Sequence, residues 1–155
     1  MISNYASSLI LKGMTGRGSG SSSYPGSITL ASRAFLALSS TEPQKNGQGV
    51  TEPSGNGYAR KQIGYALDTY GQAMGDPVNG VITNKDEIHF NEATGEWGTL
   101  TYACIYDAAT GGNLIASGKL GKINSETGDW EEQSITPVAN SVVVIKEGNL
   151  KISIE

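Results

Sequence analysis

The single histidine and the single cysteine are the side chains best suited to chemistry near neutral pH, one as a proton carrier and the other as a nucleophile. His89 lies between Ile88 and Phe90, and no G-x-S-x-G motif supplies a serine for a Ser-His-Asp device. One cysteine, Cys104, allows neither an intrachain disulfide nor a Cys-based metal site. We therefore predict a surface or strand-pairing role for His89, a core role for Cys104, and no catalytic residue.

Carboxylates gather in several places, and a pair of carboxylates is what a glycosidase uses. They lie at residues 86–87, 92, 96 and 129–132. Most stand beside Gly or Asn, in the company typical of turns, where Asp and Glu serve as turn and surface residues. Asp107, Asn113 or the turn at 124–132 offers oxygen ligands for a weak Ca²⁺ site, but the EF-hand spacing is absent. The sequence thus predicts no enzyme and no metal centre.

Four aromatic residues, Trp97, Tyr102, Tyr106 and Trp130, are of the types that stack on sugars. Aromatic residues at such spacings on strands are also what the core of a β-sandwich requires, and we interpret them as core residues. A carbohydrate-binding module remains an alternative. The glycines at 13, 16, 18 and 20 lack the GK[ST] ending of a phosphate loop, so no nucleotide or other cofactor is predicted.

Composition favours an all-β domain. Gly accounts for 21 of the 155 residues and charged residues for 17%, so helix formers are scarce and turn formers are common. The length fits one domain with one core. A net charge of −4 excludes electrostatic attraction to nucleic acid or to an anionic membrane. No run approaches the ~18 apolar residues of a membrane span and no signal peptide is visible, so we expect folding in the cytosol of the cell that makes the protein.

The most regular pattern is at residues 97–120, where two arms alternate around a turn at 107–113. Tyr102, Cys104 and Tyr106, together with Leu100, occupy one face of the first arm, as the period of two of a strand requires. The turn contains two glycines, which adopt positive φ without strain. We predict a central β-hairpin here.

Shorter strand patterns surround this hairpin. They are predicted at residues 33–39, 58–65, 81–83, 87–90, 133–137, 141–146 and 150–154, with turns at 124–129 and 147–149. The strand at 33–39 is apolar on both faces, which is typical of mid-sheet or of a subunit contact. Residues 41–57 form a long exposed loop, and loops of this length are often functional or interfacial. About eight short antiparallel strands indicate a β-sandwich or a jelly-roll-like barrel.

The N-terminal residues predict a short amphipathic helix. Ile2, Tyr5 and Leu9 follow a helical spacing, Ser3 or Asn4 can cap it, and Gly13 can end it. A helix of this length is marginal alone, so it must pack on its own domain or on a partner. A Gly/Ser-rich connector follows at 13–26. The expected organisation is therefore an N-terminal helix and arm at 1–26 and a β-domain at 27–155.

Four stretches carry a resemblance to a known group of proteins: LALSSTEP at 36–43, VTEPSGNGYAR at 50–60, WGTLTYACIYDAATGGNLIASGKL at 97–120, and LKISIE at 150–155. Together they resemble small virion proteins of tailed bacteriophages, a group labelled tail fibre, minor tail or head decoration proteins. The resemblance covers most of residues 31–155, and its motifs are turn and core motifs.

The resemblance implies a non-enzymatic virion protein that assembles with itself and binds the phage particle. The leading expectation is a head decoration or cement protein bound to the major capsid protein, with a tail-associated protein as the alternative. Apolar strands at 34–38 and 142–145 indicate association between copies, and the resemblance favours a homotrimer. We expect the interface to include Ile2, Tyr5, Leu9, Phe35, Leu36 and Val143.

Overall fold

The chain folds mainly into antiparallel β-strands, as the sequence predicts. The computed structural model describes residues 1–14, 33–64 and 74–153. Within them lie one helix and ten strands: α1 (Asn4–Met14), β1 (Ala34–Ser39), β2 (Lys61–Gly64), β3 (Val81–Thr83), β4 (Ile88–His89), β5 (Tyr102–Tyr106), β6 (Leu114–Lys119), β7 (Gly121–Ile123), β8 (Trp130–Glu132), β9 (Val144–Ile145) and β10 (Lys151–Ser153). The all-β fold class is confirmed.

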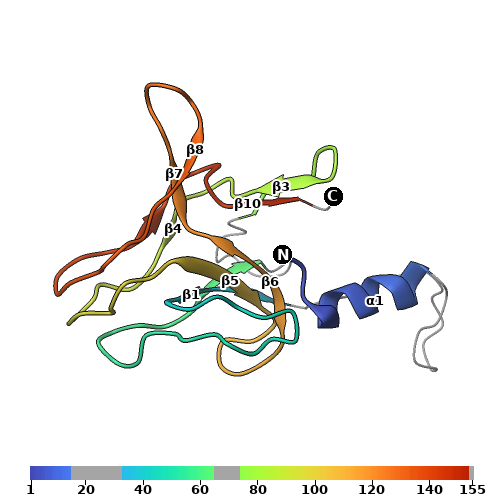
Figure 1. Ribbon diagram of the computed structural model, residues 1–155, viewed down its shortest axis with the longest axis horizontal. Coiled ribbons are helices and arrows are strands. Elements are labelled where there is room, and N and C mark those ends of the chain that lie inside the picture. Colours follow the sequence, from blue (N-terminus) through green and yellow to red (C-terminus); the bar gives the residue numbers. More distant parts are fainter. Residues whose placement is uncertain (15–32, 65–73, 154–155) are drawn as a thin grey trace.

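The largest sheet has four strands in the order β2-β1-β5-β6, and all neighbours are antiparallel (Figure 1). Its centre is the predicted hairpin, in which Cys104 of β5 faces Ser117 of β6. A register shift between Ile105 and Tyr106 marks a bulge close to the turn. Strand β1 pairs with β5 on one side and β2 on the other, so the apolar pattern at 33–39 is that of a mid-sheet strand.

The four-stranded sheet is covered on both faces. The first face carries Leu36, Leu38 and Ile105 and packs on Phe90 and Trp97. The second face carries a smaller cluster of Ala37, Cys104, Tyr106 and Leu114, against which Val50 of the loop at 41–57 packs. Because both faces are buried, every residue of β1 from Phe35 to Ser39 is buried within the chain.

The start of the central hairpin differs from the prediction. Leu100 packs in the same cluster as Ile105, whereas Cys104 belongs to the opposite face. The reason is that the regular strand begins only at Tyr102, while Leu100 forms an isolated bridge with Ile135. The period of two therefore cannot be extended back through the residues before the strand.

Two short ladders, β4–β9 and β3–β10, complete the main core. Ile88 and Phe90 are buried in it, and Ile145 and Ile152 pack against it. The buried Asn84 ties these ladders together. Its side-chain amide donates to the carbonyl oxygens of Asp86 and Lys146, and its side-chain oxygen accepts from the backbone of Leu150. Both N–H donors and the oxygen of its side chain are thus hydrogen-bonded, as a buried amide requires.

A hairpin that the sequence analysis did not predict stands away from this body (Figure 1). Strands β7 and β8 pair through Gly121 with Glu132, Lys122 with Glu131, and Ile123 with Trp130. Every residue of both strands is exposed. The predicted turn at 124–129 is its tip, where Asn124 accepts from the backbone of Glu126.

The N-terminal helix is confirmed and projects to the right of the body in Figure 1, away from the β7–β8 hairpin at the top. Ser3 is its cap, because the Ser3 hydroxyl accepts a hydrogen bond from the backbone N–H of Ala6 at 3.2 Å. The helix runs to Met14, so Gly13 does not end it. Most of the predicted connector at 13–26 lies outside the described residues. No helix of the described segments is long and apolar enough to cross a membrane.

Shortening Leu36 should test this core. Leu36→Ala removes a side chain that is 0% exposed, and such truncations cost roughly 2–5 kcal/mol of unfolding free energy. Val142→Ala is the matched control, because Val142 is exposed and surface changes stay within about ±0.5 kcal/mol. Urea unfolding followed by circular dichroism measures both variants. Equal midpoints for the two would contradict the position of β1 in mid-sheet.

Candidate functional site

The residues with the most reactive side chains lie apart. His89 is exposed, and its Nε2 lies 3.0 Å from Glu87 Oε2. Cys104 is fully buried, and burial raises the pKa of its thiol to about 12, so the thiolate is scarce at neutral pH. Among residues 1–14, 33–64 and 74–153, no three His, Cys, Asp or Glu side chains come together as metal ligands. The described residues that other molecules can contact are the exposed ones, and several hydrogen-bond networks hold the loops and turns that carry them.

A partly buried ion pair ties the long loop to the turn of the central hairpin. Arg60 donates from Nε and Nη2 to the Glu52 carboxylate over 2.6–3.1 Å, and 8% of the Arg60 side chain is exposed. Its Nη1 donates to the carbonyl oxygens of Ala108 and Gly111 at 2.9 and 2.7 Å. The guanidinium also lies 3.6 Å from the centroid of the Tyr106 ring. Arg60 therefore fixes the position of the turn at 107–113.

The same turn is stiffened from within. Asp107 accepts from the backbone and the side-chain amide of Asn113, at 2.6 and 2.8 Å. Partial burial acts to raise the pKa of the Asp107 carboxyl, but these hydrogen bonds outweigh it and lower the pKa. Gly112 has φ of 74°, and a Cβ there would lie 2.5 Å from Asp107 Oδ1. The turn is thus a fixed surface feature.

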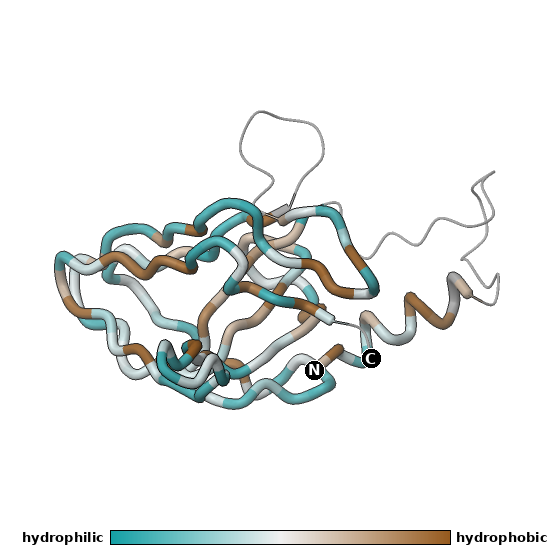
Figure 2. Tube along the Cα trace, turned by 90° about the horizontal axis from the view of Figure 1, so that it is seen from above, coloured by the Kyte–Doolittle hydropathy of each residue, from teal (hydrophilic) through white to brown (hydrophobic). Residues whose placement is uncertain are grey.

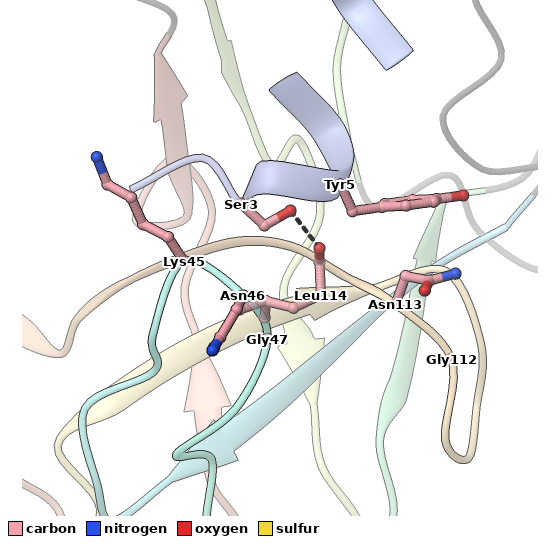
Figure 3. A pocket seen from close by; sticks show the side chains of 8 residues that line it. All are labelled: Ser3, Tyr5, Lys45, Asn46, Gly47, Gly112, Asn113 and Leu114. Atoms are coloured by element: carbon pink, nitrogen blue, oxygen red, sulfur yellow. Dashed lines mark hydrogen bonds between the residues drawn. The ribbon is translucent and has the colours of Figure 1, made fainter. Parts of the chain in front are cut away.

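The N-terminal residues pair with the free edge of β6. The Met1 ammonium donates to Ser117 O at 2.6 Å, and the Met1 carbonyl accepts from Ser117 N at 2.9 Å. Ser3 N donates to Ile115 O at 2.9 Å, and the Ser3 hydroxyl donates to Leu114 O (Figure 3). Residues 1–3 therefore cover part of the sheet edge and anchor α1 on the β-domain.

A small polar pocket lies where α1 leaves the sheet. Its volume is about 120 Å³, and Figure 3 shows Lys45 and Tyr5 at its sides. The residues that line it are Ser3, Tyr5, Lys45, Asn46, Gly47, Gly112, Asn113 and Leu114. The one buried polar side chain among them, Ser3, is already bonded to Leu114 O and to Ala6 N. The polar groups of Ser3 are therefore already used to hold the start of α1.

The structure distributes the expected interface residues over core and surface. Phe35 and Leu36 are buried inside the chain, so β1 has no apolar surface to offer to another copy, contrary to the expectation for residues 34–38. Val143 points inward and packs on the main core. Ile2 and Leu9 are half-buried, with Ile2 bridged to Ala116. Tyr5 alone of the six is exposed.

The large apolar residues that are exposed lie mainly in three places. One is on and beside α1, one is on the β7–β8 hairpin, and one follows the segment at 135–144. The members are Met1, Tyr5, Leu11 and Met14; Ile123 and Trp130; and Val138, Val142 and Val144. For the third group the sequence holds a signal. Successive strand residues face opposite sides, so if Val143 faces the core, its neighbours Val142 and Val144 face outward.

The prediction that the four aromatic residues lie in the core is correct for only part of the group. Trp97 and Tyr106 are buried, and the Trp97 indole N–H donates to Asn56 O at 2.8 Å. Trp130 is 52% exposed, so its assignment to the core is wrong. The hairpin that carries Trp130 has no buried side, which leaves this ring no core to enter.

The fold and these features define a β-domain whose outer surface carries apolar residues at several places. A protein-family model described as Podophage GP4 fiber I protein gp80 matches residues 2–137, which is most of the chain. The chain therefore belongs to this family, and it is a structural protein of the phage virion. No curated protein matches the chain.

Removing Arg60 should loosen the turn of the central hairpin. Arg60→Met takes away the charged partner of the partly buried Glu52 carboxylate and leaves it the Tyr58 hydroxyl at 2.9 Å, so the free energy of unfolding should fall by roughly 1–3 kcal/mol. Lys119→Met is the matched control, because Lys119 pairs with Glu132 on the exposed surface and its loss should change stability little. Urea unfolding gives the free energies, and amide exchange at Gly112 and Asn113 should accelerate in the Arg60 variant only. Unchanged exchange there would refute the role of Arg60.

Proposed function

We propose that the protein is a structural subunit of the phage tail fibre, without catalytic activity, which assembles with copies of itself and attaches to the particle through its N-terminal segment. The observation that carries this proposal is the family match over residues 2–137, whose description is that of a fibre protein. That description favours the tail over the head, so the proposal takes the alternative of the sequence analysis in place of a capsid decoration protein.

The buried networks support a mechanical role. A fibre subunit transmits force between its attachment point and its far end, so its loops must not yield before its sheets. The Arg60–Glu52 pair fixes the longest loop, and Asn84 fixes the C-terminal ladders through three side-chain hydrogen bonds. Hydrogen-bond networks whose polar groups are satisfied make the segments that they join more rigid.

The N-terminal helix is suited to attachment. It is anchored at its first turn by Ser3, while Leu11 and Met14 near its far end are 61% and 73% exposed. Figure 2 shows apolar residues along the projecting helix. Apolar side chains that are exposed on a helix of this kind gain burial by contact with another molecule.

Location and copy number test the proposal. Gold-labelled antibodies against the protein should decorate the tails of intact virions in electron micrographs, and the heads should carry only background label. Band intensities of purified virions should correspond to tens of copies or fewer per particle. Labelled heads, with hundreds of copies, would refute the tail proposal and restore the capsid decoration protein.

Attachment through α1 has its own test. The double substitution Leu11→Glu and Met14→Glu should leave the circular dichroism spectrum and the unfolding midpoint unchanged, because both side chains are exposed. Incorporation into virions should fall by roughly tenfold or more, since charges would have to be buried at the contact. Val78→Glu is the matched control, because Val78 is 67% exposed and far from α1 in sequence. Equal incorporation of all three proteins would contradict attachment through α1.

A further inference from the structure

The β7–β8 hairpin carries an exposed indole that lies against its own backbone. Trp130 of β8 is opposite Ile123 of β7, and 52% of Trp130 is exposed. A Cβ placed on Gly121 would lie 2.4 Å from Cε2 and 2.5 Å from Cζ2 of this indole, so the ring occupies the space that a side chain at residue 121 would need. The backbone thus supports the ring on one side, while half of the residue remains open to solvent.

An ion pair lies on the same face of the hairpin as the indole. Glu132 is two residues after Trp130 on β8 and is opposite Gly121, so its side chain is on the side of the hairpin that carries the ring. Lys119 Nζ donates to Glu132 Oε1 at 2.6 Å, and both side chains are exposed. This face therefore combines a flat apolar ring with a carboxylate and an ammonium.

Two polar groups beside the ring are free to bond a ligand. In the part of the chain that the structure describes, neither the indole N–H of Trp130 nor Oε2 of Glu132 has a hydrogen-bond partner, because the Lys119 ammonium uses Oε1. The indole N–H is a donor, and the carboxylate oxygen is an acceptor. A molecule that stacks on the ring therefore meets one group of each kind at its rim.

The composition of the hairpin argues against two kinds of occupant. Residues 119–132 carry two lysines and four carboxylates, a net charge of −2, which repels nucleic acids and acidic polysaccharides. Ile123 and Trp130 are the large apolar side chains exposed on it, among charged and turn residues. A stable protein contact buries roughly 1,200–2,000 Å² and has an apolar centre, which two side chains on a charged hairpin do not supply.

We propose that this face of the β7–β8 hairpin binds a neutral hexopyranose unit of a polysaccharide, with the sugar ring stacked on Trp130 and its hydroxyls bonded to Glu132 and to the indole N–H. A pyranose fits because its C–H groups pack on an aromatic ring, while the hydroxyls at its rim need donors and acceptors. Trp97 and Tyr106, which the sequence also allowed for sugar stacking, are buried. The inference goes beyond the proposed function, which requires no ligand.

Lys119 acts on this site through Glu132. Its ammonium holds one carboxylate oxygen at 2.6 Å, which orients the other oxygen, and it places a cation beside the ring. Lys119 is therefore a positioning residue, whereas Trp130 and Glu132 contact the sugar.

A glycan array of the full chain gives the first test. The array carries neutral oligosaccharides of glucose, galactose and mannose, together with acidic oligosaccharides of equal length. The protein should bind at least one neutral glycan saturably and the acidic glycans more weakly. In a titration with that neutral glycan, the emission of the exposed Trp130 should change, whereas the buried Trp97, which is bonded to Asn56 O, should not respond.

Three substitutions locate the binding. Trp130→Ala should weaken it by roughly tenfold or more, the effect of losing a central contact, and Trp130→Phe should weaken it less because a ring remains. Glu132→Gln should weaken it as well, because a neutral acceptor replaces a charged one. Val78→Ala is the matched control, since Val78 is exposed outside the hairpin, and it should bind as the unchanged protein does. Circular dichroism and unfolding midpoints establish that each variant is folded.

Three results would overturn the proposal. Absence of saturable binding to every neutral glycan would remove the ligand, and binding that survives Trp130→Ala would place any sugar site elsewhere. Stronger binding of the acidic glycans would contradict the argument from the charge of the hairpin. None of these results would change the label seen on tails, so the proposed function is judged separately.

Discussion

Strand β1 has no face left for solvent, and the rest of the fold is arranged to satisfy this constraint. One side is covered by the main core with Phe90 and Trp97. The other side carries the small Ala37 and Cys104 and is covered by residues of the long loop, including Val50. A loop used as a cover must be held by polar contacts, because its apolar residues are few. Ser39 supplies one, as its hydroxyl accepts from Thr51 N at 3.0 Å, and the Arg60–Glu52 pair supplies another.

Short sequence patterns were enough to predict the helix, strands and turns that depend on residues close together in the sequence. The hairpin of β5 and β6, the strand at β1, the alternation of β10 and the Ser3 cap all follow from neighbours within a few residues. The pairing of β3 with β10 and of β4 with β9 joins segments far apart in sequence, and no short pattern encodes it. The role of Asn84 depends on that pairing. Asn84 holds two distant segments, because its side chain bonds the backbones of Lys146 and Leu150.

The candidate surfaces were harder to predict than the fold, because apolarity alone does not separate a core residue from a contact residue. Phe35 and Leu36 are as apolar as an interface requires, but β1 is enclosed by its own chain. In the valine run the period of two decides, and it places Val142 and Val144 outward once Val143 is known to face the core. In strands β7 and β8 every residue is exposed, so buried and exposed residues do not alternate there as they do in a strand that covers a core. Trp130 could not be recognised as a surface residue without that knowledge.

The exposed β7–β8 hairpin has few contacts that hold it in place. Two-stranded hairpins are at best marginally stable in water, and β7–β8 is held by its own pairing, by the turn at Asn124 and by the exposed Lys119–Glu132 pair. Its local opening should therefore be the cheapest in the described β-domain. Any molecule that binds the hairpin has to order it, and this cost lowers the affinity of the contact. A contact between molecules that are already held side by side is made at a high effective concentration, which offsets such a cost.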